Sequence, residues 1–316
     1  MQNNNLIVSM SPHLRGTHSI EWMMHTFIIG LIPPAVMALY LFGIQCLVIM
    51  ALSMATAVIV EAAIQRLTNQ QLTYKDCHAI LTGLMLALIL PPSVPWWIPV
   101  VGASVAIILG KLVFGGLGNY PFNPPLVAWV VLKLSWPERM SLFFAPHTHS
   151  QALTPLMAFK EDPSLFYSYD MIDLFLGNIP GPLGTVCGLA VLIGAVFILY
   201  RGVIRWHIPI SFLFGVGLFA GILHAINPDV YPPAIFHLLS GGLLLGAFFI
   251  APEPVTSPVT PKGMLLFGTL AGILTMIIRM WGAYPDGTFY AILIMNTATP
   301  LFNYLKPRKY GRLKRA

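Results

Sequence analysis

The sequence predicts an all-α protein that crosses a membrane many times, and three observations indicate this. Apolar residues make up 57% of the 316 residues and charged residues only 9%, whereas a soluble domain carries roughly 25% charged residues. The mean hydropathy is +0.77. Apolar runs of about 17–25 residues, the length that spans a bilayer, recur along the chain. The composition therefore excludes disorder, a secreted disulfide scaffold and a free nucleic-acid-binding domain.

The apolar runs predict about ten spans. The first 21 residues are polar and lack a leading apolar core, so no cleavable signal peptide is expected. The tract from Trp22 to Ile64 is too long for one span, and its break is expected at Gly43-Ile44-Gln45, which gives a helical hairpin. The remaining spans are expected at 79–90, 97–114, 124–134, 186–200, 208–226, 234–250, 264–280 and 288–305.

Lysine and arginine favour short cytoplasmic loops and therefore indicate the orientation. Ten spans with a cytoplasmic C-terminus place twelve of these residues inside, and only Arg139 and Lys160 outside. Three more, Lys111, Lys133 and Arg279, lie within or at the ends of spans. Both termini are therefore predicted to be cytoplasmic. The twelve inside residues are Arg15, Arg66, Lys75, Arg201, Arg205, Lys262, Lys306, Arg308, Lys309, Arg312, Lys314 and Arg315.

This topology divides the chain into five parts. A membrane half at 22–134 and another at 185–305 are separated by an outer loop at 135–184, which is expected to be structured and to lie on the membrane surface. A cytoplasmic segment, 1–21, and a basic cytoplasmic tail, 306–316, complete the chain.

The two halves resemble each other weakly, which predicts an inverted repeat with broken helices. Leu81-Thr82-Gly83-Leu84 opens an apolar helix that runs into Pro91-Pro92, and Leu239-Ser240-Gly241-Gly242 opens one that runs into Pro252-Glu253-Pro254. Each is followed by a span that ends near a cation and by a turn rich in Gly, Tyr and Pro. On the expected topology the first block starts inside and the second outside, as in transporters whose broken helices meet at mid-membrane. The alternative is that Gly and Pro are simply common in membrane helices.

Motifs for metals or nucleotides are nearly absent. The three cysteines stand alone, without the paired spacing of zinc or iron–sulfur sites, and the close pair His147 and His149 is more typical of a solvated loop. No phosphate loop or dinucleotide fingerprint is found, so the chain is not expected to oxidise NADH itself. Among ionisable residues in apolar segments, the lysines are expected to snorkel. Glu61 either lies at the end of its span beside Arg66 or is functional, and Arg279 is a candidate partner of Asp286.

Two turns are candidate ligand sites. Asn123 and Asp286 each lie where a turn enters a short apolar helix, and the free N–H groups of such a helix end bind acceptors. Phe122 would add an aromatic face and Gly118 would allow a planar ring to approach the backbone. A capped re-entrant turn without a ligand is the alternative.

Several motifs resemble one family closely and in order along nearly the whole chain. They include Pro91-Pro92-Ser93-Val94-Pro95-Trp96-Trp97, Pro121-Phe122-Asn123-Pro124, Arg205-Trp206-His207-Ile208-Pro209 and Tyr284-Pro285-Asp286-Gly287. The chain resembles the RnfD family, which comprises membrane proteins of Rnf ion-translocating electron-transport complexes and is related to the NqrB proteins of the sodium-pumping NADH:quinone reductase.

The resemblance implies a fold similar to urea transporters and an FMN joined by a phosphodiester bond to a threonine on the outer side, where a flavin transferase attaches it. The nearest match to the family's attachment motif is Ser150-Gln151-Ala152-Leu153-Thr154-Pro155-Leu156, which makes Thr154 the candidate. The match departs from the family pattern because Leu153 is inserted and no aspartate precedes it. A second, non-covalent flavin is compatible with the resemblance.

The resemblance also implies a function. The chain would be one component of a bacterial inner-membrane translocase, assembled with the A, B, C, E and G proteins of the Rnf complex in the lipid bilayer. Electrons passing between ferredoxin and NAD would drive Na⁺ or H⁺ across the membrane. Two alternatives stand beside it: a passive solute channel, suggested by the repeat alone, and a scaffold component of the same complex that has lost its flavin.

Overall fold

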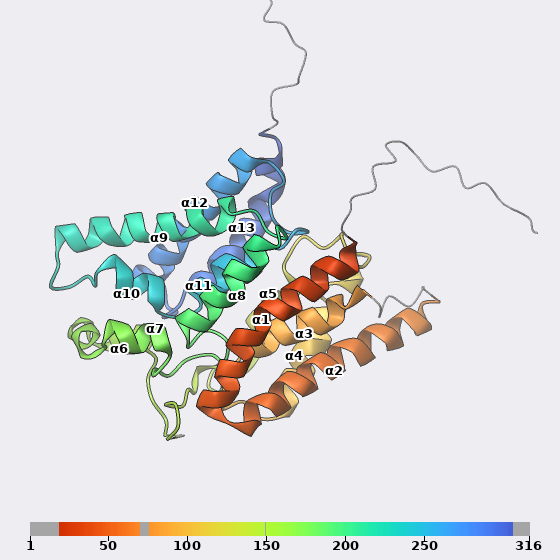
Figure 1. The fold of residues 1–316 in the computed structure, drawn as a ribbon, viewed down its shortest axis with the longest axis horizontal. Coiled ribbons are helices and arrows are strands. Elements are labelled where there is room, and N and C mark those ends of the chain that lie inside the picture. The colour runs from red at the N-terminus through yellow and green to blue at the C-terminus, as the bar shows by residue number, and fades with distance from the viewer. Residues whose placement is uncertain (1–18, 70–75, 149, 306–316) are drawn as a thin grey trace, which may run out of the picture.

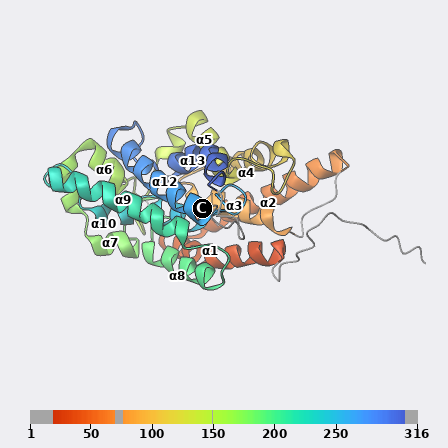
Figure 2. The same cartoon turned by 90° about the horizontal axis from the view of Figure 1, so that it is seen from above.

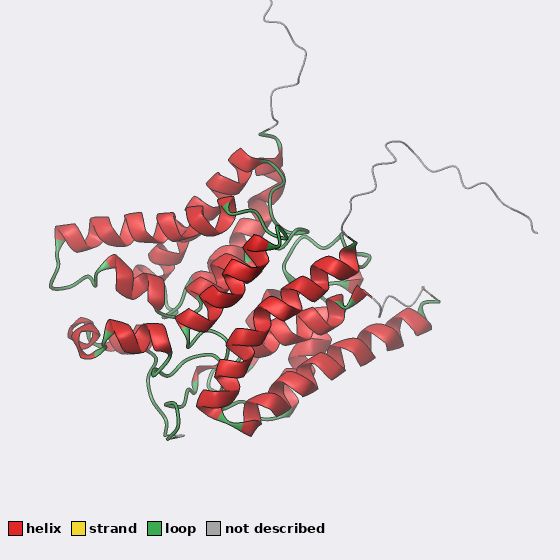
Figure 3. Ribbon diagram, viewed as in Figure 1, coloured by secondary structure: helices red, strands yellow, loops and turns green. Residues whose placement is uncertain are grey.

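The computed structural model describes residues 19–69, 76–148 and 150–305. The predicted basic tail, nearly all of the predicted N-terminal segment, and Lys75 and His149 lie outside the described residues. The described chain is mostly helical and contains no strand, since its single isolated bridge joins Phe144 and Gln151 (Figure 3). The predicted all-α class is confirmed.

The helices follow one another with short connections, except between α5 and α8. Their bounds are α1 Ile20–Phe42, α2 Ile44–Leu67, α3 His78–Ile89, α4 Trp97–Ile108, α5 Pro124–Ser135, α6 Pro155–Glu161, α7 Met171–Leu176, α8 Gly188–Tyr200, α9 His207–Ile226, α10 Ala234–Leu239, α11 Leu243–Leu245, α12 Pro261–Trp281 and α13 Thr288–Asn303. The 3₁₀ turns are η2 Leu112–Phe114, η3 Arg139–Ser141 and η4 Pro163–Ser168, and η5, Gly246–Ile250, is a π-helix.

The predicted hairpin in the first apolar tract is confirmed. Helix α1 ends and α2 begins at Gly43, whose φ is +78°. Glycine adopts a positive φ without the clash that a Cβ would cause, so the chain can reverse here between two apolar helices. The Gly43 N–H donates to Leu39 O at 2.9 Å and completes the last turn of α1.

Five apolar helices in the described part are long enough to cross a membrane: α1, α2, the α4–η2 segment 97–114, α9 and α12. Helices α3 and α5 have 12 residues each and α8 has 13. At a rise of about 1.5 Å per residue, 12 residues cover roughly 18 Å of a hydrocarbon core about 30 Å thick. The chain is therefore a multi-pass membrane protein that combines five long apolar helices with shorter apolar ones.

The apolar segment 234–250, expected as one span, is interrupted near the motif Leu239-Ser240-Gly241-Gly242. It is divided into α10, α11 and η5, with the break at Ser240–Gly242. Gly241 has a φ of +69°, and the carbonyl oxygen of Ser240 accepts a hydrogen bond from the Arg279 guanidinium at 2.9 Å. Arg279 thus supplies donors that the helix ladder would otherwise provide.

The helices form two groups that meet along α1, α8, α5 and α13 (Figure 1). In the first group α4 packs against α2 and α5, and in the second α12 packs against α9 and α13. Figure 2 shows α1 beside α8. A close approach joins α9 to α12, where a Cβ at Gly272 would lie 2.4 Å from Phe212 O. Small residues at such contacts let membrane helices associate through their backbones.

The segment between α5 and α8 is folded onto the second group. It contains η3, α6, η4 and α7, and α7 packs against α10. Phe159 of α6 and Phe166 of η4 make edge-on contacts with Phe236 of α10, with ring centroids 6.2 Å apart in each pair. The segment between α5 and α8 is therefore a structured part of the molecule, and its place on the outer side stays a prediction.

Candidate functional site

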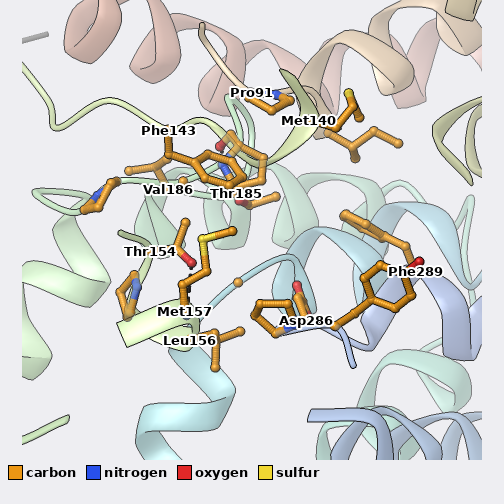
Figure 4. A pocket seen from close by; sticks show the side chains of 18 of the residues that line it. Pro91, Met140, Phe143, Thr154, Leu156, Met157, Thr185, Val186, Asp286 and Phe289 are labelled. Carbon is orange, nitrogen blue, oxygen red and sulfur yellow. Dashed lines mark hydrogen bonds between the residues drawn. The ribbon is translucent and has the colours of Figure 1, made fainter. Parts of the chain in front are cut away.

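A large pocket lies where the α5–α8 segment meets the turn before α13. It contains about 720 Å³ of empty space, part of which is open to solvent. Its walls are mainly apolar and come from both helix groups and the segment between them (Figure 4). The lining includes Pro91, Trp129, Lys133, Met140, Phe143, Thr154, Met157, Thr185, Gly241, Asp286, Phe289 and Tyr290. Apolar walls with a few polar groups are typical of cofactor sites.

Thr154, the candidate attachment residue, lines this pocket. It is the N-cap of α6, and its Oγ1 accepts a hydrogen bond from the N–H of Met157 at 3.3 Å. Pro155 at the first helical position holds the extended conformation that precedes it. The residue is partly exposed, and its hydroxyl can still donate its own proton. Thr154 is thus held on a helix end with its oxygen at the pocket wall.

The wall away from Thr154 is aromatic. Trp129 of α5 makes edge-on contacts with Phe289 and Tyr290 of α13, with ring centroids 5.1 and 5.0 Å apart. Figure 4 shows Phe289 on the opposite side of the pocket from Thr154, with Asp286 below the opening between them. A planar ring can lie against such a surface through stacking or edge-on contacts.

Asp286 is held by a network of hydrogen bonds around Arg279. Asp286 Oδ1 lies 3.1 Å from Arg279 Nη2, and Oδ2 accepts the N–H of Gly242 at 2.7 Å. The fully buried Arg279 also donates to the carbonyl oxygens of His237, at 2.6 Å, and Ser240. The predicted pairing of Arg279 with Asp286 is confirmed. The network joins α10, α12 and α13 beside the pocket.

Lys160 ties the helix that carries Thr154 to the same turn. Its ammonium donates to Arg279 O at 3.4 Å, to Tyr284 O at 3.2 Å and to Gly282 O. Carbonyls at a helix C-terminus lack partners within the helix, and a cation there is favourable. Partial burial lowers the pKa of Lys160 below its ordinary value. The position of α6 is therefore coupled to that of the Asp286 turn.

Asn123 lies elsewhere, in a second buried polar cluster. Its Nδ2 donates to Glu253 Oε2 at 2.9 Å, and Glu253 also accepts from the hydroxyls of Tyr120 and Thr256. His78 Nε2 lies 2.9 Å from the Tyr120 oxygen. A smaller cavity borders Asn123, Glu253 and His78. The predicted site residues are thus divided: Thr154 and Asp286 share one pocket, and Asn123 belongs to another region.

The turn before α5 does not offer the expected free N–H groups, and the turn before α13 has one of its N–H groups bonded. At the start of α5, positions 124 and 125 are prolines, and the N–H groups of Leu126 and Val127 bond to Asn123. At the start of α13, the Thr288 N–H donates to Asp286 Oδ1 at 3.1 Å. Asn123 thus caps α5 with its own side chain, whereas no side chain caps α13 at Gly287. Phe122 is half-buried, and Gly118, with φ +94°, has no heavy atom near its Cβ position.

The expectation that Lys111 snorkels to the membrane surface is wrong. Its Nζ lies 2.7 Å from Glu61 Oε1, and both side chains are almost completely buried. Gln65 Nε2 donates to the same oxygen at 3.1 Å. Glu61 therefore pairs with Lys111 inside the first helix group, a partner that the sequence pattern around Arg66 does not indicate.

The sequence motifs do not predict three features of these sites. They are the buried cluster around Glu253, the inward position of Lys133 and the aromatic wall of the pocket. Glu253 follows a broken helix and is flanked by two prolines, which is a signal for a buried functional carboxylate. Trp129 and Lys133 are four residues apart, so helical periodicity places them on one face of α5. Nothing local shows what lies opposite that face.

The chain is similar to known proteins along nearly its whole length. The model of the NQR2, RnfD, RnfE family matches residues 7–311. The chain is 40% identical over 318 residues to the D component of the Na⁺-translocating ferredoxin:NAD⁺ oxidoreductase complex of Acetobacterium woodii, covering 99% of this chain and 98% of that protein. It is 36% identical over 343 residues to the D component of the ion-translocating oxidoreductase complex of Yersinia enterocolitica, covering 96% and 98% of the two chains.

Proposed function

Because the chain belongs to the NQR2, RnfD, RnfE family, we propose that it is the flavin-carrying membrane component of an Rnf-type complex. The complex couples electron transfer between ferredoxin and NAD to the movement of Na⁺ or H⁺ across the bacterial inner membrane. The observation that carries the flavin assignment is the position of Thr154, whose hydroxyl opens onto an apolar pocket with an aromatic wall.

The residues of this pocket fit FMN. Thr154 would hold the phosphoryl group, while Trp129, Phe289 and Tyr290 would contact the planar ring at the far wall. FMN supplies one- and two-electron transfer when it is bound. The protein residues orient it, and the apolar walls limit the access of water. Thr148 and Ser150, the other hydroxyls near the attachment motif, are exposed, lie 3.0 Å from each other and are absent from the pocket lining.

We further propose a fold of ten membrane segments in two inverted repeats, similar to urea transporters. The support is that the two groups have the same packing order. Helix α4 packs between α2 and α5, and α12 packs between α9 and α13. Each group also has a buried cation at the end of its central helix region, Lys111 in the first and Arg279 in the second. In this arrangement the short helices α3 and α10–η5 meet near the middle of the membrane.

The proposed topology places both termini in the cytoplasm and Thr154 on the outer side, where a flavin transferase would attach FMN. The other proteins of the complex, A, B, C, E and G, would supply the sites for ferredoxin and NAD. Asn123 and Asp286 would act as structural caps beside the electron path, rather than as direct flavin ligands, because their polar atoms are already engaged. No second flavin is required by this proposal.

In-gel fluorescence tests the proposal. The denatured wild-type chain should fluoresce under ultraviolet light after electrophoresis, because a phosphodiester bond survives denaturation, and Thr154→Ala should not fluoresce. Thr148→Ala and Ser150→Ala are matched controls that remove a nearby hydroxyl and should keep the signal. Peptide mass mapping that finds the adduct on either control residue would contradict the assignment of Thr154. A dark wild-type chain in assembled complex would favour the flavin-less scaffold.

A further inference from the structure

Lys133 brings a positive charge to the pocket that contains Thr154. It lies in the last turn of α5 and is half-buried, and its Nζ donates to Met140 O at 3.1 Å and to Ser141 Oγ at 2.6 Å. An ammonium group has three N–H donors, so these two bonds leave one donor for another acceptor. The carbonyl and the hydroxyl are neutral and hold the group in place without neutralising its charge.

The charge of Lys133 has no counter-ion among the residues that the structure describes. The ion pairs there join Glu61 to Lys111 and Asp286 to Arg279. Asp286 is the other ionisable acidic or basic group in the pocket lining, and Arg279 already balances it. Because a charge at an apolar wall is costly unless it is compensated, an electron-rich occupant of the pocket is favoured.

The ammonium group lies at the aromatic end of the pocket. Trp129 and Lys133 are one helical turn apart on the same face of α5, and Trp129 contacts Phe289. Lys133 is bonded to the backbone of Met140, and Figure 4 shows Met140 and Phe289 on the side away from Thr154. Thr154 and Met140, whose carbonyl oxygen accepts from Lys133, therefore lie on opposite sides of one cavity.

The geometry points to Lys133 as the residue that tunes the flavin, a role that rests on the proposed function. The Thr154 end holds the phosphoryl group, and Lys133 donates a hydrogen bond to a carbonyl oxygen at the edge of the ring. A positive charge beside a ring that gains electron density on reduction favours the reduced form. No bond is made or broken in this role, and Lys133 keeps its proton, so only its charge and its hydrogen bond act.

The test is a redox titration of the covalent flavin in purified complex, followed by absorbance. The comparison is made at the ambient potential where the wild-type flavin is half reduced. Lys133→Met should lower the ratio of reduced to oxidised flavin by about tenfold there, because the ring loses one charge interaction that solvent only partly screens. Lys133→Gln removes the charge but keeps a donor for Met140 and Ser141, and it should show the same shift if the methionine variant does not fold. Lys133→Arg should stay within about threefold of the wild type.

The control is Arg139→Gln, which removes an exposed cation of η3 that does not line the pocket. It should leave the titration unchanged. Wild-type redox behaviour in both neutral Lys133 variants, at wild-type flavin content, would overturn the inference. Loss of covalent flavin in both neutral variants and its return in Lys133→Arg would also overturn it, since Lys133 would then act at the phosphoryl group. If the proposed function itself is wrong, the wild-type chain will show no in-gel fluorescence, which separates that failure from a failure of the Lys133 inference.

Discussion

Lys111 Nζ lies 2.7 Å from Glu61 Oε1, although the two residues are 50 positions apart and their side chains are only 3% and 4% exposed. The pair joins α2 to the end of the α4–η2 segment within the first helix group. A buried ion pair is not by itself strong evidence of stabilisation, because both charges are removed from water. Losing one partner is different, since the other charge is then buried alone.

Lys111→Met should therefore lower the free energy of unfolding by about 3–5 kcal/mol. The double variant Glu61→Gln with Lys111→Met should recover more than half of that loss, because neither charge remains. The measurement is the fraction of detergent-purified protein that stays monodisperse after heating. Lys262→Gln removes an exposed lysine and should have almost no effect. A double variant as unstable as the single one would argue against the pair.

Asn123→Ala should act on stability first. It removes the cap of α5 and one of the donors to the buried Glu253 carboxylate, which together should cost about 2–4 kcal/mol. Asn123→Asp keeps an N-cap oxygen but places a second carboxylate beside Glu253, and it should be less stable than Asn123→Ala. Thermal unfolding compares the two variants. Equal stability of Asn123→Asp and the wild type would show that Glu253 does not depend on Asn123 as a donor.

Gly241→Ala should damage the break between α10 and α11. The residue has a φ of +69°, and a Cβ would lie 2.6 Å from Asp286 Oδ2 and 2.7 Å from Leu156 Cδ1. The strain and the overlap should cost about 2–5 kcal/mol and displace Asp286 from Gly242. Because Gly241 also lines the pocket, covalent flavin content per folded protein should fall as well.

Gly217→Ala is the matched control for that variant. Gly217 lies within α9, and beyond the adjoining backbone of α9 no heavy atom is within 4 Å of its Cβ position. Alanine is a better helix former than glycine, so stability should be unchanged or slightly higher. Thermal unfolding and in-gel flavin fluorescence should be measured for both variants. An effect of Gly217→Ala as large as that of Gly241→Ala would show that the contacts at residue 241 are not the cause.

The sequence predicts the parts of the fold that depend on local composition. The hairpin at Gly43 is one, because a glycine between two apolar runs is enough to end one helix and start another. The motif Leu239-Ser240-Gly241-Gly242 also indicates a helix start, but the contact that stabilises the break there could not be predicted in this way. The carbonyls at the break are satisfied by Arg279, which lies 39 residues beyond Ser240, and local hydropathy contains no information about that contact. Long-range hydrogen bonds decide where an apolar segment is interrupted.

The same distinction applies to the candidate site. A family motif and a predicted side of the membrane identify Thr154, and both are properties of the sequence. For Lys133 the sequence predicts snorkelling, because a lysine near the end of a span usually does so. Lys133 lines the pocket because Trp129, Met140 and the segment that carries Thr154 surround the same cavity. That arrangement follows from tertiary packing and could not be derived from helical periodicity.

The orientation in the membrane is the last prediction. A reporter that is active only outside the cytoplasm should be active when it is fused after Glu161, because the segment that carries Thr154 is expected on the outer side. The same reporter should be silent after Arg66, Arg205 or Lys314, which lie among the twelve lysines and arginines assigned to the inside. The five long helices and the shorter apolar ones fit either an odd or an even number of spans. The reporter experiment decides between these two topologies. Full-length fusion proteins should be compared at equal expression, with a cytoplasm-active reporter at each position as the control.

Activity of the outside reporter after Lys314 would contradict an even number of spans with both termini inside. Silence after Glu161 would place Thr154 on the cytoplasmic side, where the proposed outer attachment of FMN would be impossible.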